Sequence, residues 1–239
     1  LCMITASTPW IGLSFPDLAV IIQKVITENF SNLPVVTDRL QQAHVNFHSL
    51  VKLMQGDLLK HKSMQYNGKA IADGKERYYV GISNGGIQGA AYAALSKEIN
   101  YFVLSVTGGV WSAMIQRSSN FALMAMALAN RYPRAVDRAV LVSLSQHIWD
   151  YTDPITWAPH VVDSPLTGYT KKQVIYQESL YDDQVPNLTT RIMARALGLT
   201  ALSPAVEKVY GLPQKAGPLD SAFVQWDMKP KVKPYPENI

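Results

Sequence analysis

Residues 78–87 decide how this chain is expected to fold, and they read Tyr78-Tyr79-Val80-Gly81-Ile82-Ser83-Asn84-Gly85-Gly86-Ile87. The apolar, aromatic-rich beginning predicts a buried strand that breaks abruptly at glycine. The small residues from 86 to 95 then predict a helix packed closely on a sheet. Gly81-x-Ser83-x-Gly85 is the nucleophile-elbow pattern, in which a serine lies on a strained turn between a strand and a helix.

Each position of this pattern has its own physical reason. Gly81 and Gly85 lack a Cβ, so neighbouring backbone can pass close to a turn whose central residue is forced into an unfavourable conformation. The helix directs its unpaired N–H groups and its positive dipole end at the serine oxygen. The N–H of Asn84 is then predicted to donate to an oxyanion, and Gly86 leaves room for the helix to approach the sheet. The plainer alternative is a glycine-rich turn without chemistry.

Composition indicates one globular α/β domain over residues 1–239, because 48% of the residues are hydrophobic and 17% are charged. The net charge of +4 is scattered along the chain, which argues against a nucleic-acid-binding protein. Cys2 is the only cysteine, so no intrachain disulfide and no cysteine-based metal site is expected. No apolar stretch approaches the roughly 20 residues that span a bilayer. No metal and no cofactor is predicted.

The order of the remaining elements predicts a parallel sheet. Residues 1–6 are expected to form a buried strand, and residues 38–55 a long helix with one apolar stripe. The strand expected at 101–106 follows the helix after Ser83, and a strand, a helix and a strand in succession form a βαβ unit with parallel strands. The remaining predictions are strands at 171–178 and 222–226 and a helix at 188–197.

Residues 111–165 are predicted to form a helical lid within the domain. They are largely helical and apolar, and they interrupt the succession of strands. Trp111, Trp149 and Trp157 would then cover a pocket for an acyl or aromatic group. The same helices are equally well explained as part of the core.

Asp182 is the candidate partner for Ser83. A serine hydroxyl is a poor nucleophile until a base takes its proton, and that base needs a carboxylate to hold its tautomer. Asp182 comes just after a predicted strand and before Val185-Pro186, where such a carboxylate belongs. Asp183 is the competing choice, and either residue can instead be an aspartate of an ordinary turn.

These segments resemble the α/β-hydrolase superfamily. The resemblance rests on Gly81-Ile-Ser83-Asn-Gly-Gly86 before a small-residue helix and on Asp182-x-x-Val185-Pro186 after a later strand. More narrowly, from Thr5 to about Leu199, the chain is similar to a group of mostly uncharacterised bacterial α/β-hydrolases. The segments that carry this similarity are Trp10-Ile-Gly-Leu-Ser14, Asp38-Arg-Leu-Gln41, Tyr79-Val-Gly-Ile-Ser83, Gln116-Arg-Ser118, Trp149-Asp150, Asp153-Pro154 and Asp182-Asp-Gln-Val-Pro-Asn187.

The resemblance implies a mostly parallel sheet flanked by helices, with a helical lid, and hydrolysis of a small carboxylic ester through an acyl-enzyme. Ser83 would be the nucleophile, Asp182 the acid and Asn84 an oxyanion donor. The resemblance also implies strands upstream of residue 1 and a histidine after the acid. We therefore expect a fold that is incomplete at both ends, with missing segments or a partner chain completing the sheet.

The histidines leave the general base open, because all five precede Asp182: His44, His48, His61, His147 and His160. Either the base lies outside this chain, or the protein is a non-catalytic homologue that serves as a structural or binding subunit. His147 can in principle be recruited from the lid, but a structural role is the plainer expectation. The pair at 44 and 48 has zinc-binding spacing but lacks the adjacent glutamate of metalloprotease helices, so helix packing is expected instead.

Overall fold

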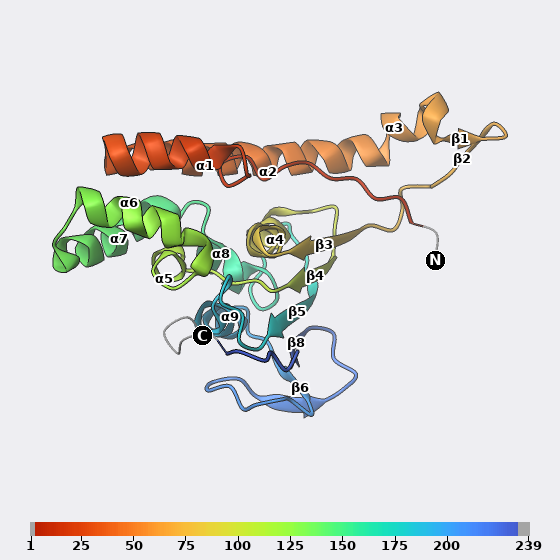
Figure 1. The fold of residues 1–239 in the computed structure, drawn as a ribbon. Helices are drawn as coiled ribbons and strands as arrows, with labels where there is room; N and C mark the ends of the chain where they lie inside the picture. The colour runs from red at the N-terminus through yellow and green to blue at the C-terminus, as the bar shows by residue number, and fades with distance from the viewer. Residues whose placement is uncertain (1–2, 234–239) are drawn as a thin grey trace.

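The computed structural model describes residues 3–233, and its centre is a six-stranded sheet in which all neighbouring strands are parallel (Figure 1). The strand order is β3-β4-β5-β8-β6-β7. The strands are β3 (Tyr78–Ile82), β4 (Tyr101–Ser105), β5 (Gln173–Ser179), β6 (Ala201–Ser203), β7 (Gln214–Ala216) and β8 (Ala222–Trp226), and a separate hairpin joins β1 (Gln65–Tyr66) to β2 (Lys69–Ala70). The predicted α/β class with a parallel sheet is confirmed.

Helices precede, connect and follow these strands. Before β3 come α1 (Asp17–Val20), which continues as the π-helix η1 (Ile21–Glu28), then η2 (Phe30–Asn32), α2 (Pro34–Gln55), α3 (Asp57–Lys60) and η3 (Lys62–Met64). Between β3 and β5 lie α4 (Asn84–Leu95), α5 (Trp111–Ile115), η4 (Ser119–Phe121), α6 (Ala122–Arg131), α7 (Ala135–Trp149), α8 (Pro154–Trp157) and η5 (Ala158–His160), and α9 (Asn187–Ala196) follows β5. Within the described residues, no helix is long and apolar enough to cross a membrane.

The βαβ unit of β3, α4 and β4 forms where the sequence predicts it. Ile82 pairs in register with Ser105, and Ser105 with Gln177, so β3, β4 and β5 end at one edge of the sheet. The alanines of α4 have no exposed surface, because this helix packs on the sheet and on α8, while His44 and Phe47 of α2 contact its Gln88 and Tyr92. In Figure 1, α2 runs as a long rod above α4. The predicted apolar stripe of α2, including Leu40, Ala43, Phe47 and Val51, is buried.

Two features of the strands depart from the sequence prediction. Residues 3–6 form no strand, since Met3 is 64% exposed and these residues pair with no strand of the described chain. Residues 1–2 of that predicted strand lie outside the described residues. The strands β6 and β7 were not predicted, because three residues are too few to show a periodic pattern.

One face of the sheet is open to solvent over β3, β4 and β5. Figure 1 shows α4, α8 and α9 on the opposite side of these strands. The open face carries Tyr78, Val80, Ile82, Tyr101 and Ile175, which are 45–67% exposed. Parallel sheets are normally covered on both faces, so this is an uncommon arrangement. β3, which carries Ser83 at its end, is also the edge strand of the sheet.

A buried imidazole joins α2 to α4. His44 Nε2 lies 3.2 Å from Gln88 Oε1, and its ring contacts Trp10 edge-on with a centroid distance of 4.9 Å. Burial lowers the pKa of His44 to about 4, and the hydrogen bond to Gln88 opposes that decrease. His44 is therefore neutral in the folded protein at every pH above about 4.

We predict that His44 makes the fold sensitive to mild acid. Between pH 6.5 and about 4 the unfolded chain protonates this imidazole while the folded chain does not, so stability falls as the pH falls. The shift corresponds to a loss of about 3 kcal/mol in the free energy of unfolding. Urea unfolding at several pH values should show a shallower pH dependence for His44→Phe than for the wild type. The exposed His147→Phe is the control, and an equal pH dependence in all three proteins would contradict the assignment.

Candidate active site

Ser83 occupies a strained turn between β3 and α4. Its backbone has φ 54° and ψ −123°, in a region that residues with a Cβ rarely adopt. Gly81 permits this turn, because a Cβ there would lie 2.2 Å from the carbonyl oxygen of Gly85. Gly86 allows α4 to pass close to β4, since its Cβ would lie 2.9 Å from the carbonyl oxygen of Ser105. At Gly85 the added Cβ would meet nothing closer than 3.9 Å. Of the two outer glycines of the pattern, Gly81 is the one that packing requires.

The hydroxyl of Ser83 is not used to cap the helix that follows it. Ser83 precedes α4 directly, yet its side chain accepts no capping hydrogen bond, and the residue is partly exposed. Its backbone N–H donates to the carbonyl of Ser105 at 3.0 Å, which fixes the turn to β4. The first bond of α4 runs from the N–H of Ile87 to the carbonyl of Ser83, so the three amides from Asn84 to Gly86 have no carbonyl within the helix to bond.

The side chain of Asn84 holds a second loop against the elbow. Its Nδ2 donates to the carbonyl of Leu13 at 3.3 Å, while its buried Oδ1 has no partner within residues 3–233. The loop of Leu13 is itself organised by the buried Asp17, whose Oδ2 accepts from the amides of Gly12 and Ser14 at 2.8 and 2.9 Å. The elbow therefore has one wall that comes from the first residues of the described chain.

Strained residues gather at the edge where β3, β4 and β5 end. Besides Ser83 (φ 54°), positive φ angles occur at Val106 (44°) and Val110 (61°) after β4 and at Tyr181 (65°) after β5. In the described part of the chain only two other non-glycine residues have positive φ, Asn67 and Lys229. Valine in this region is a genuine outlier, and such outliers concentrate at functional sites.

Asp182 lies on the loop that follows β5, and its side chain hydrogen-bonds to the backbone of that same loop. Its Oδ1 accepts from the amides of Gln184 and Val185, both at 2.9 Å, while its Oδ2 has no hydrogen-bond partner among residues 3–233. Burial raises the pKa of the Asp182 carboxyl, and the two amides oppose that increase. Because β4 alone separates β3 from β5, the strands that carry Ser83 and Asp182 lie about 10 Å apart at the same edge.

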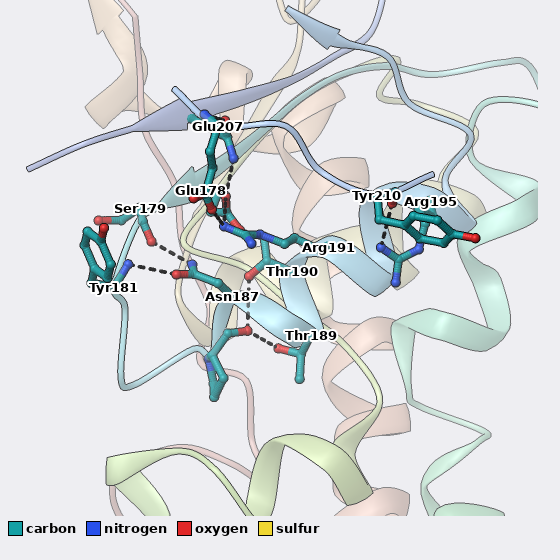
Figure 2. A network of polar contacts seen from close by, with 12 residues as sticks. Glu178, Ser179, Tyr181, Asn187, Thr189, Thr190, Arg191, Arg195, Glu207 and Tyr210 are labelled. Atoms are coloured by element: carbon teal, nitrogen blue, oxygen red, sulfur yellow. Dashed lines mark hydrogen bonds and ion pairs between the residues drawn. The ribbon is translucent and has the colours of Figure 1, made fainter. Parts of the chain in front are cut away.

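The loop of Asp182 is held in place by residues to which the sequence assigned no role (Figure 2). Asn187 is buried; its Oδ1 accepts from the amide of Tyr181 at 2.8 Å, and its Nδ2 donates to the carbonyl of Ser179 at 2.7 Å. One turn later in α9, Arg191 Nε donates to the fully buried Glu178 at 2.8 Å, and Arg191 also contacts Glu207. Figure 2 shows the guanidinium end of Arg191 directed toward Glu178 and Glu207.

The same loop is tied to the helices between β4 and β5. Ser118 Oγ donates to the carbonyl of Gln184 at 2.5 Å, and the amide of Ser119 donates to the carbonyl of Asp183 at 2.9 Å. Asp183 thus helps to hold this loop through its backbone carbonyl. The nearby Asp153 is wholly buried and accepts from the amides of Val110 and Trp111 at 2.9 and 2.6 Å. Asp153 is a structural carboxylate that fixes the strained start of α5.

No histidine of the described chain hydrogen-bonds to Ser83 or to Asp182. His147 is exposed on α7, 4.0 Å from Asp150, and His160 Nδ1 contacts the carbonyl of Ser164 at 2.8 Å. His48 packs against the ring of Tyr92, next to the buried His44. Residues 3–233 contain no group of three or more His, Cys, Asp or Glu side chains that could hold a metal ion. Comparison with known protein families, with curated proteins and with solved structures finds no match to this chain.

We predict that the two outer glycines of the elbow respond differently to substitution. Gly81→Ala should lower the free energy of unfolding by about 3 kcal/mol, because its Cβ meets backbone that cannot move without reshaping the elbow. Gly85→Ala should leave it unchanged or raise it by up to about 1 kcal/mol, because the space is open and alanine favours a helix. Chemical unfolding measures both, and equal losses would contradict the packing described here.

We also predict that Asn187 holds the loop of Asp182. Asn187→Ala removes two buried hydrogen bonds and should lower the free energy of unfolding by about 2 kcal/mol. Amide hydrogen exchange at Gln184 and Val185 should accelerate at the same time, because the turn around Asp182 loosens. Gln184→Ala changes an exposed side chain of the same loop and should stay within about 0.5 kcal/mol of the wild type. Unchanged exchange in Asn187→Ala would exclude this role.

Proposed function

We propose that the protein is a serine hydrolase that cleaves a carboxylic ester through an acyl-enzyme, with the α/β-hydrolase arrangement of its catalytic groups. The single observation that carries the proposal is the geometry of Ser83. The residue has φ 54° at the start of α4, its hydroxyl is free of capping, and further strained residues follow the neighbouring strands at the same edge. A glycine-rich turn without chemistry needs none of these three features.

The reaction follows from the groups at this edge. Ser83 Oγ attacks the ester carbonyl carbon as its proton passes to a general base, and the negative charge on the carbonyl oxygen is held by the N–H of Asn84. The intermediate collapses, the alcohol leaves with the proton, and the acyl group stays on Ser83. Water then attacks the acyl-enzyme and releases the carboxylic acid. Asp182 offers Oδ2 to orient the base, since Oδ1 is occupied by its own loop.

The base itself is an imidazole supplied by polypeptide that docks at the loop of Asp182. None of the described histidines fills this role, and a carboxylate with one free oxygen at the edge of the sheet is suited to receive one. In the free chain, burial raises the pKa of Asp182, and a cationic imidazole beside it would lower that pKa again.

A second candidate function is that of a non-catalytic structural or binding subunit. The observation that favours it is the open, uncharged face of β3, β4 and β5, with Val80 and Ile82 67% and 66% exposed. An apolar face of a parallel sheet is normally covered, so a subunit of an assembly would use this surface. In that case the hydroxyl of Ser83 has no base to activate it.

A fluorophosphonate probe separates the two candidates. We expect covalent labelling at Ser83, read by mass spectrometry of peptides, in the longest natural polypeptide that contains this chain. Ser83→Ala should abolish labelling, whereas Ser105→Ala, at the end of the neighbouring strand, should retain it. A folded protein that is not labelled at Ser83 would favour the subunit and reject the hydrolase.

A further inference from the structure

A mostly apolar cavity of about 270 Å³, partly open to solvent, lies in the helical part of the molecule, between η1 on one side and α6 and α7 on the other. Its wall includes Ile21 and Val25 from η1, Met124 and Leu128 from α6, and Val142 and Trp149 from α7. The three tryptophans that were predicted to cover one pocket lie in different places. Trp149 lines this cavity, Trp111 stacks on Trp149 with a centroid distance of 5.2 Å, and Trp157 packs elsewhere, beside the sheet.

The wall of the cavity is mostly apolar. Its polar groups belong to Gln116, Arg138 and Trp149, and the buried Nε1 of Trp149 has no hydrogen-bond partner among residues 3–233. Gln116 Nε2 donates to the carbonyl of Ser112 at 2.9 Å, and Arg138 Nη1 donates to the carbonyls of Tyr132 and Pro133, both at 2.8 Å. A predominantly apolar ligand therefore fits this space better than one that is polar along its length.

The cavity adjoins the elbow of the candidate active site through the loop of Leu13. Leu13 lines it, and the carbonyl of the same residue accepts the hydrogen bond from Asn84, next to Ser83. Ile87, one turn into α4, and Val185, on the loop of Asp182, do not line the cavity, but they belong to the same apolar cluster as residues that do. The cavity is thus connected to the elbow directly through Leu13 and to the loop of Asp182 through packed apolar side chains.

We propose that this cavity binds the apolar acyl chain of the ester, which makes the substrate class an ester of an aliphatic carboxylic acid. The inference rests on the proposed function for its link to Ser83. The acyl carbonyl lies at the elbow, and the chain runs between η1 and α6. Each methylene that enters the cavity leaves water, so affinity should rise about fourfold per methylene until the space is filled.

The test measures binding separately from catalysis. Sodium butanoate, hexanoate, octanoate and decanoate are titrated by calorimetry into Ser83→Ala protein, on the natural polypeptide. We expect the dissociation constant to fall about fourfold per methylene over part of this series. Met124→Trp narrows the cavity from α6 and should weaken octanoate binding at least tenfold. Met126→Trp is the matched control, because Met126 lies on the same helix and is 64% exposed, against 8% for Met124.

A second measurement tests the link to Ser83. In wild-type protein, octanoate should slow fluorophosphonate labelling of Ser83, and Met124→Trp should remove that protection. Equal affinity across the series, or octanoate binding unaffected in a folded Met124→Trp protein, would overturn the cavity assignment whatever Ser83 does. Binding that does not protect a labelled Ser83 would overturn the link. Absence of labelling with chain-length-dependent binding would reject the hydrolase and leave the cavity as an apolar-chain site.

Discussion

The close approach of α4 to β3 and β4 is the constraint on which the rest of this structure depends. A Cβ at Gly89 would lie 2.5 Å from the ring of Tyr79, and one at Gly86 would lie 2.8 Å from the Cβ of Thr107. Only glycine at these positions allows the helix to pack this closely on the strands. This close packing leaves no room for a relaxed connection between β3 and α4, so the backbone of Ser83 is strained. The strained turn follows from the packing.

The parallel arrangement of the strands places several strained connections at one edge of the sheet. Strands that run in one direction end on one side, so the connections after β3, β4 and β5 meet there. Each contains a non-glycine residue at positive φ, and buried side chains hold the connections after β4 and β5. Asp153 fixes the connection after β4 and Asn187 the one after β5, so both act as supports for backbone that would otherwise relax.

Features encoded in a short stretch of sequence could be predicted, and features made by distant contacts could not. The βαβ unit, the long helix and the final strand were predicted because each has a periodic or glycine-marked signal of its own. Two contacts depend on how α9 packs against β5: the hydrogen bonds by which Asn187 supports the loop of Asp182, and the ion pair of Arg191 with Glu178. No local sequence pattern predicts this packing. The predicted strand at 1–6 was wrong for residues 3–6, because apolar residues form a strand only where a neighbouring strand accepts their backbone bonds.

Backbone strain bears on the choice between a hydrolase and a subunit. A residue with a Cβ at the φ of Ser83 costs on the order of 1–3 kcal/mol, and glycine would avoid that cost. Val106 and Val110 add further strain at the same edge, where a sheet that served only as a scaffold could end in glycine. The open sheet face is compatible with either function, because it lies on the surface of the sheet and leaves the edge with Ser83 free. Strain concentrated on a hydroxyl-bearing residue is therefore the feature that favours chemistry over assembly.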